Sequence, residues 1–345
     1  MLPYLLILGF IIFWISLEKK SLHRNAFWVP FFILVLFASL RSYLVGTDTG
    51  SYTSDFRNPL DSNYYIFRQD LEYGYQLLEY LILKFTHNYF WLFFVSSVLV
   101  VGSYLYIFKK NSENYILSVV IFISFGFYLF YFNGLRQGIA MAIVALATPY
   151  LINKQFLKYA LVILLASFFH KTALIMLLFY FIIHLKFKLE FKALAVFLGS
   201  YLISGSVIQY LAVSNEKYSS YAEVSENAGG YLTLFFYFSI SLLLYIFYKK
   251  YKINNSDYYI LLQLCLYGVV FLIPVALLGA SPSGPQRLLF YFVWVVSLLI
   301  PTAMVKLNSK ILYSVFIFLA FIYYSMVLGF GNLLPYQLNE NFRIF

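Results

Sequence analysis

Charged residues are scarce in this sequence: they make up 11% of the 345 residues, whereas 62% of the residues are hydrophobic. A soluble domain needs a polar, charged exterior, so this composition excludes an ordinary soluble globular protein. The solvent of most of the chain must therefore be lipid. The net charge of +10 comes mainly from lysines between apolar runs, which indicates membrane topology. We expect no nucleic-acid partner.

Cysteine is almost absent. Cys265 is the only one and lies within an apolar run, so an internal disulfide and a cysteine-based metal cluster are both excluded. We interpret it as a small buried hydrophobic residue. The sequence also lacks a Gly-rich phosphate loop after a strand, a helical His-Glu pair of a zinc site, and a Gly-x-Ser-x-Gly nucleophile elbow.

Long hydrophobic runs are what the chain does have. Runs of about 15 to 20 residues recur along its length, and a helix needs roughly 20 residues to cross ~30 Å of hydrocarbon. The predicted fold class is all-α: a polytopic integral membrane protein with about twelve transmembrane helices. The predicted spans are residues 3–17, 26–40, 89–108, 115–132, 137–152, 158–170, 172–185, 193–211, 231–248, 258–279, 288–305 and 311–329. Without repeats or low-complexity linkers, we expect a single membrane domain over residues 1–345.

Lysine and arginine are distributed unequally between alternate connections. Fifteen cations follow the odd-numbered spans, and the positive-inside rule assigns those connections to the cytoplasm. Segment 71–86 is almost apolar enough to be a further span, but it contains Glu72, Glu79 and Lys84 and has an apolar stripe of helical spacing. We predict that it is an amphipathic helix at the outer surface.

With this orientation, six of the seven arginines lie outside, where they oppose the topology signal. Arginine binds phosphate in a bidentate manner, so an outer cluster suggests a phosphorylated ligand. The alternative for each arginine is pairing with an outer carboxylate or a lipid headgroup. Arg136 and Arg287 each open a span at its outer end, where they can reach a lipid diphosphate.

The outer connections hold further candidates. In loop 41–72, the run from Gly46 to Gly50 has turn chemistry that would fold Asp48 back toward the membrane. His170 lies between two short spans beside Lys171, and an ionisable pair there is a candidate site, unless the histidine only anchors the interface. An imidazole can accept a hydroxyl proton at neutral pH. Loop 212–230 carries tyrosines and carboxylates that either bind sugars or are solvated.

Five short motifs share the predicted outer side. They are Arg41 with Val45-Gly-Thr-Asp-Thr49 and Tyr52, Glu72-Tyr-Gly-Tyr75, Asn133-Gly-Leu-Arg136-Gln137 with Ala140, His170-Lys-Thr-Ala173, and Arg287. Together they resemble the EpsG family of Wzy-type polysaccharide polymerases. The resemblance covers most of the chain. It implies that the protein joins undecaprenyl-diphosphate-linked oligosaccharide units at the outer face of the bacterial cytoplasmic membrane.

We expect the diphosphate to be the leaving group and arginines to neutralise its growing charge. The arginines expected in this role are Arg136, Arg287 and then Arg41. The candidates for the base that takes the acceptor proton are His170, then Asp48 and Glu72. The residues expected to bind sugar or acceptor are Tyr52, Tyr75, Gln137 and Lys171. The resemblance implies no metal or other cofactor; if the arginines did not converge, Asp48 and Asp55 would be the carboxylates to hold a metal ion.

Two other classes of function stay open. A flippase would move a lipid-linked sugar without breaking a bond, but such proteins place ionisable residues near the bilayer midplane and often have repeated halves. An O-acyltransferase acting on glycans could use His170, but it leaves the arginines unexplained. The expected partners of the polymerase are the lipid-linked oligosaccharide, membrane lipids and a chain-length regulator.

Overall fold

The structure is a computed structural model that describes residues 1–58, 65–214, 229–279 and 284–339. Within these residues the regular structure is helical, and the one strand-like feature is an isolated bridge between Arg41 and Leu338. The all-α fold class predicted from the sequence is confirmed.

Every predicted span coincides with a helix or a broken helix. These elements are α1 (Leu2–Leu22), α2 (Trp28–Ser39), α6 (Phe90–Asn111), α7 (Tyr115–Ser124) with α8 (Phe127–Asn133), α9 (Leu135–Leu146) with α10 (Thr148–Ile152), α11 (Phe156–Ser167), η2 (Lys171–Leu174) with α12 (Ile175–His184), α13 (Leu189–Ser214), α14 (Gly229–Tyr251), α15 (Ser256–Leu277), η4 (Pro285–Leu289) with α16 (Phe290–Val293) and α17 (Val296–Leu307), and α18 (Lys310–Phe330).

Seven helices among the described residues are long and apolar enough to cross a membrane alone, or eight if the bent pair Pro285–Val293 and Val296–Leu307 forms one span. Four shorter apolar helices cover the remaining predicted spans. The total of about twelve is therefore consistent with the structure.

The described helices group into two compact units. Unit 1 comprises Met1–Leu151, Gln155–Leu174 and Met304–Phe345, and unit 2 comprises Ile152–Lys154 and Ile175–Ala303. We describe each unit by itself, and the single membrane domain expected from the sequence stays a prediction.

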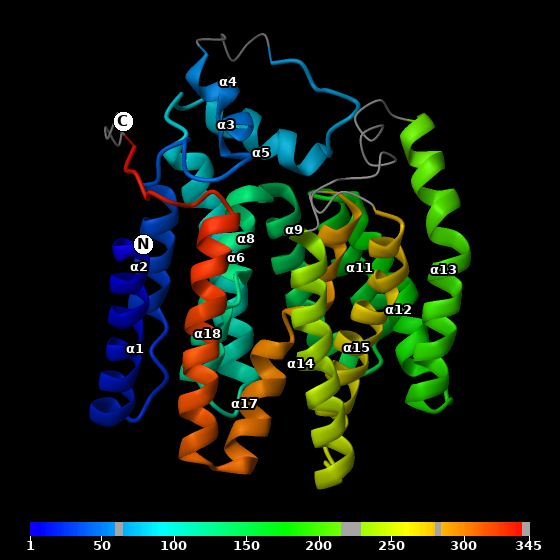
Figure 1. Ribbon diagram of the computed structural model, residues 1–345. Coiled ribbons are helices and arrows are strands. Elements are labelled where there is room, and N and C mark those ends of the chain that lie inside the picture. Colours follow the sequence, from blue (N-terminus) through cyan, green and yellow to red (C-terminus); the bar gives the residue numbers. More distant parts are fainter. Residues whose placement is uncertain (59–64, 215–228, 280–283, 340–345) are drawn as a thin grey trace. The chain divides into compact units, whose positions relative to one another are not determined.

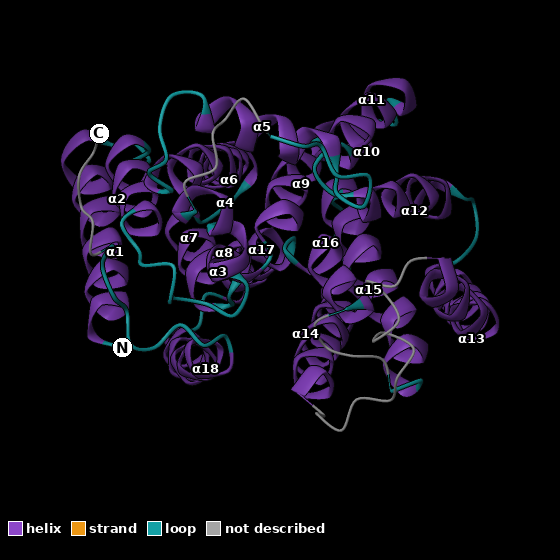
Figure 2. Ribbon diagram, turned by 90° about the horizontal axis from the view of Figure 1, so that it is seen from above, coloured by secondary structure: helices purple, strands orange, loops and turns teal. Residues whose placement is uncertain are grey.

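In unit 1, α2 packs on α6, α6 on α9, and α9 on α11. Figure 2 shows the long helices of this unit nearly end-on. Three short helices, α3 (Thr49–Tyr52), α4 (Ser54–Arg57) and α5 (Tyr73–Leu83), lie together beyond one end of the bundle (Figure 1). The last turns of α1 and α6 carry Lys19, Lys20, Lys109 and Lys110 at the opposite end.

Helix α5 confirms a separate helix within segment 71–86, but its polar stripe does not face water. Glu72, Gln76 and Glu79 are buried, whereas Tyr73 and Leu77 on the opposite side are exposed. The helix therefore turns its carboxylates toward the interior of unit 1, and this orientation builds the site described below.

In unit 2, α15 is the central helix: α13, α14, α12, α16 and η4 all pack against it. Cys265 lies in this helix, fully buried, with its Sγ 3.3 Å from the Ser241 hydroxyl. Its interpretation as a small buried residue is confirmed.

A candidate active site around Glu72

Three motifs that are far apart in the sequence meet at one buried carboxylate in unit 1. Glu72 stands at the N-terminus of α5 and is only 4% exposed. Its Oε2 accepts a hydrogen bond from Nη1 of Arg136, in the first turn of α9. Its Oε1 lies 2.8 Å from Nδ1 of His170 and accepts the backbone N–H of Lys171 at 3.3 Å. A predicted phosphate ligand and two predicted bases thus form one cluster.

Gly74 explains how α5 reaches His170. Its N–H donates to the Phe168 carbonyl oxygen at 2.8 Å, and a Cβ at position 74 would lie 2.8 Å from that same oxygen. Real Cβ atoms do not approach backbone so closely. A side chain at this position would therefore push the first turn of α5, and Glu72 with it, away from the segment that carries His170.

We expect Gly74→Ala to reduce activity by about 100-fold, because a displacement of about 1 Å in a catalytic arrangement costs that much. Gly50→Ala is the matched control, since a Cβ at Gly50 meets nothing within 4 Å. The measurement is the rate of glycan elongation for both variants at equal protein in the membrane. Equal rates would show that the contact at Gly74 does not position Glu72.

The loop from Arg41 docks on the end of α8 and brings Tyr52 to the cluster. The Thr47 N–H donates to Asn133 Oδ1 at 2.8 Å, and the Thr49 hydroxyl donates to the Phe132 carbonyl at 3.0 Å. Gly46 has a φ of +106° and packs against the Asn133 side chain, so its position requires glycine. These bonds tie the Gly-Thr-Asp-Thr motif to the Asn133 motif.

Two aromatic residues of the predicted sugar-binding set lie beside Arg136. The Tyr52 and Tyr75 rings are 6.0 Å apart, the Tyr75 ring is 6.0 Å from Cζ of Arg136, and Arg136 also hydrogen-bonds Tyr52. Gln137 follows Arg136 and is buried, whereas the Lys171 side chain is exposed.

Asp48 and Arg41 are placed differently from the cluster. Asp48 is half-buried at the N-terminus of α3. The hydrogen bonds of Glu72 described above join it to Arg136, His170 and Lys171 instead. Arg41 is fully buried, with its Cζ 3.7 Å from the centre of the Phe93 ring and 4.1 Å from that of Phe132. Its guanidinium thus lies between aromatic faces and makes cation–π contacts within unit 1. The diphosphate role predicted for Arg41 stays a prediction.

Arg287 belongs to unit 2, so its predicted convergence with Arg136 stays a prediction. It lies half-buried in η4 and lines a small cavity together with Gln286, Thr233 and Gly230. The other predicted outer loop, 212–230, falls mainly on residues 215–228, which lie outside the described residues.

The electrostatics assign Glu72 the role of an anchor. Burial by itself raises the pKa of a carboxyl, but the hydrogen bond and charge of His170, together with the charge of Arg136, lower the pKa of Glu72 to about 2. Glu72 is therefore ionised at neutral pH, and both of its oxygens already accept hydrogen bonds. A carboxylate with so low a pKa is a weak base, whereas a proton acceptor works best with a pKa near the operating pH and a free acceptor atom. His170 uses Nδ1 to bind Glu72, which leaves Nε2 for proton transfer.

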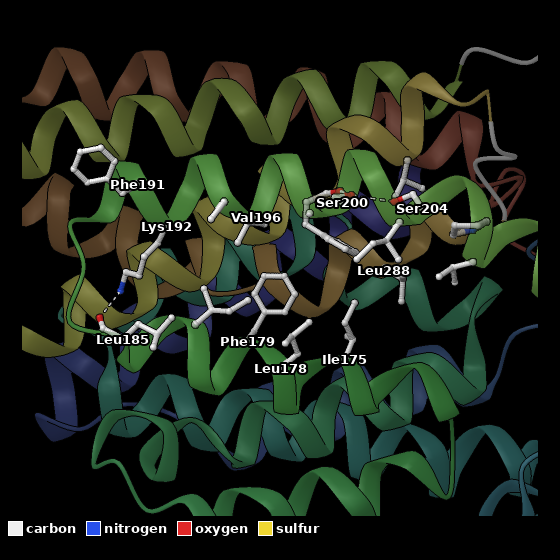
Figure 3. Close-up of a pocket in the computed structure, with 18 of the residues that line it drawn as sticks. Ile175, Leu178, Phe179, Leu185, Phe191, Lys192, Val196, Ser200, Ser204 and Leu288 are labelled. Atoms are coloured by element: carbon white, nitrogen blue, oxygen red, sulfur yellow. Dashed lines mark hydrogen bonds between the residues drawn. The ribbon is translucent and has the colours of Figure 1, made fainter.

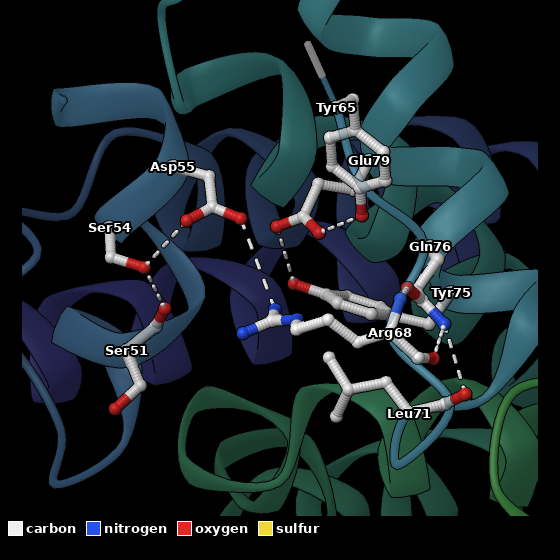
Figure 4. Close-up of polar contacts among 9 residues, drawn as sticks. All are labelled: Ser51, Ser54, Asp55, Tyr65, Arg68, Leu71, Tyr75, Gln76 and Glu79. Carbon is white, nitrogen blue, oxygen red and sulfur yellow. Dashed lines mark hydrogen bonds and ion pairs between the residues drawn. The ribbon is translucent and has the colours of Figure 1, made fainter. Parts of the chain in front are cut away.

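A second buried carboxylate lies two turns further along α5. Glu79 is 2% exposed, and it accepts hydrogen bonds from the Tyr65 hydroxyl at 2.6 Å and the Tyr75 hydroxyl at 3.4 Å (Figure 4). Gln76, between the two carboxylates, exchanges hydrogen bonds of 2.6 Å and 2.8 Å with the backbone of Arg68. The segment before α5 is thereby fastened to its polar face.

Gln76 and Glu79 were not among the site residues predicted from the sequence. The signal was present, because positions 72, 76 and 79 share one face of a helix. What the pattern alone does not decide is whether such a face meets water or protein.

Glu79→Gln is expected to raise the thermal midpoint at pH 7. Burial, with the charge of Asp55, raises the pKa of Glu79 although the Tyr65 hydroxyl opposes this. Because the pKa of Glu79 is higher in the folded than in the unfolded protein, protonated Glu79 favours folding at pH values below its unfolded-state pKa of about 4.3. This contribution to the free energy of unfolding is lost as the pH rises through the folded-state pKa. Glutamine removes this penalty, so the gain in stability is largest at neutral pH and vanishes near pH 4. Thermal unfolding in detergent between pH 4 and 8 measures it, and an equal loss of midpoint at every pH would contradict the assignment.

The comparisons with known proteins agree with this set of motifs. The profile of the EpsG family matches residues 24–338, a range that includes Glu72, Arg136, His170 and Arg287. No curated protein and no solved structure matches the chain.

Proposed function

Because the chain belongs to the EpsG family, a family of Wzy-like polysaccharide polymerases and exopolysaccharide biosynthesis proteins, we propose that it joins lipid-linked oligosaccharide repeat units into a surface polysaccharide. The donor in this proposal is a growing chain on undecaprenyl diphosphate, and the acceptor is a second lipid-linked repeat unit.

The observation that supports the proposal is the cluster of Glu72 with Arg136 and His170. In the transfer, the bond between the anomeric carbon and the diphosphate oxygen breaks, and a bond from that carbon to the acceptor hydroxyl oxygen forms. The hydroxyl proton goes to a base, and the diphosphate leaves with the bonding electrons. The cluster supplies a cation for the leaving group and an imidazole for the proton.

Arg136 can serve the leaving group while it is paired with Glu72. A guanidinium has five N–H donors, and Glu72 and Tyr52 use only part of them. A second cation from Arg287, which belongs to unit 2, stays a prediction from the sequence. His170 acts as the base through Nε2, and Glu72 holds both partners in place.

We also propose that the site faces the outside of the bacterial cytoplasmic membrane. The support is the lysine distribution in the sequence, together with the position of Lys19, Lys20, Lys109 and Lys110 in unit 1, at the end opposite to α3, α4 and α5. Membrane lipids and a chain-length regulator are the further partners in this proposal.

The decisive experiment supplies the native lipid-linked repeat unit to the purified protein in liposomes. A ladder of longer glycans is the expected result. Movement of the monomer across the bilayer without a ladder would support a flippase, and incorporation of acyl groups would support an O-acyltransferase. The cluster favours the polymerase over the flippase, because Glu72, Arg136 and His170 lie at helix ends of unit 1.

A further inference from the structure

Unit 2 contains an elongated apolar cavity of about 640 Å³ between α12, α13, α15 and η4. In Figure 3, Phe191, Val196 and Ser204 follow one another along α13, and Ile175 and Phe179 of α12 face them. The lining of α13 extends from Phe191 to Val207. At ~1.5 Å per residue this is roughly 24 Å, which is most of the ~30 Å hydrocarbon thickness of a bilayer.

The polar atoms along this cavity already have partners within unit 2. The Ser200 hydroxyl donates to the Phe271 carbonyl at 2.7 Å and lies 3.0 Å from the Ser204 hydroxyl. Nζ of Lys192 donates to the Ile183 carbonyl at 2.8 Å and to Gln263 Oε1. With these groups satisfied, the cavity has little to offer a polar ligand, and a hydrocarbon chain suits it best.

The short helix η4 lies between this apolar cavity and a second, smaller cavity. Pro285 and Leu288 line the apolar cavity, whereas Gln286 and Arg287 line a separate cavity of about 90 Å³ with Thr233. One turn of helix therefore presents apolar side chains on one side and a cation with an amide on the other. A molecule with a long apolar tail and an anionic head matches both sides.

We infer that the apolar cavity of unit 2 binds the polyprenyl chain of the lipid-linked saccharide, with the diphosphate at Arg287. This inference rests on the proposed function and adds a tail-binding site to it. A phospholipid acyl chain fits the cavity less well, because each acyl chain fills one leaflet, about half of the ~30 Å hydrocarbon core. The cavity is longer than that, and a polyprenyl chain can occupy it throughout.

Gly199 allows a sharp test of this inference. It lines the cavity, and a Cβ there meets nothing within 4 Å, so a phenylalanine can fill the space without displacing backbone. We expect Gly199→Phe to raise KM for the native long-chain donor at least tenfold. A donor with the same saccharide and diphosphate on a short prenyl chain should keep its KM. Ala195→Phe, one turn away in the same lining, should act in the same way.

Gly205→Phe is the matched control. Gly205 lies in α13 as well and also has open space at its Cβ, but it is not part of the lining. Unchanged KM for the long-chain donor in both Gly199→Phe and Ala195→Phe would overturn the inference.

Photolabelling gives a second readout that does not need turnover. Undecaprenyl diphosphate with a photoreactive group on its terminal isoprene, in phosphatidylglycerol liposomes, should label α12 and α13, and Gly199→Phe should remove the label. Equal labelling by a photoreactive phospholipid that undecaprenyl diphosphate does not displace would assign the cavity to bulk lipid. If the wild type makes no ladder with either donor but is labelled here, the polymerase proposal fails while the tail site stands.

Discussion

Arg136→Ala is expected to abolish the glycan ladder, with a loss of at least about 100-fold in elongation rate. Removal of one preorganised donor to a developing negative charge typically costs 100-fold to 1,000-fold. In this protein the same substitution also leaves the buried carboxylate of Glu72 without its guanidinium partner. Elongation from lipid-linked donor in liposomes, at equal amounts of inserted protein, is the measurement.

Two variants make the result for Arg136 interpretable. Arg68→Ala removes an arginine that is about half exposed and pairs with Asp55 at 3.9 Å, so its rate should stay near that of the wild type. Arg136→Lys keeps the positive charge but loses the planar guanidinium, which can donate two parallel hydrogen bonds to a phosphate. Its elongation rate should therefore lie between those of Arg136→Ala and the wild type. A normal ladder from Arg136→Ala would exclude this residue as a ligand of the leaving group.

The helical spans were predictable because their cause is simple. A segment that lies in lipid must satisfy its own backbone hydrogen bonds, so a run such as 258–279 can only be a helix, and it coincides with α15. Breaks within spans were less predictable. The span 115–132 is two helices that meet at Phe125 and Gly126, and a single glycine in an apolar run does not by itself indicate where a helix ends.

The members of the site were predictable one by one, but their contacts were not. The concentration of arginines on the predicted outer side drew attention to Arg136, and the position of His170 between two short spans marked it as a candidate. Their meeting at Glu72 depends on the approach of Gly74 to the Phe168 carbonyl, 94 positions away along the chain. No local pattern contains that information.

For Arg41, the surroundings of the side chain could not be predicted from the sequence. An arginine at the start of an outer loop is a reasonable phosphate ligand, but its guanidinium can also stack on aromatic rings. The aromatic neighbours of its guanidinium, Phe93 and Phe132, come from α6 and α8. Because Phe93 and Phe132 are far from Arg41 in the sequence, their contacts with its guanidinium could not be predicted.

Glu72→Gln is expected to lower the elongation rate by about 100-fold while the helices stay in the membrane. Glutamine keeps the size of the side chain but removes the charge that holds Arg136 and His170. Glu18→Gln is the matched control in unit 1, because Glu18 is also a buried carboxylate paired with an arginine, Arg24, but lies at the end opposite to α5, and its rate should stay nearly unchanged.

A double-mutant cycle separates the anchor role of Glu72 from a direct part in proton transfer. If Glu72 acts by positioning His170, then His170→Gln alone should cost about as much as the Glu72→Gln, His170→Gln pair, because residues that act as a unit are strongly non-additive. Independent losses that multiply would mean that Glu72 and His170 contribute separately, and Glu72 would then not act by positioning His170. The pH dependence of the elongation rate checks the ionisation state of Glu72. The depressed pKa of Glu72 keeps it ionised from about pH 4 upward. Glu72→Gln should therefore lower the rate by the same factor at every pH from about 5 to about 8, and a loss that grows with pH in this range would contradict the assignment.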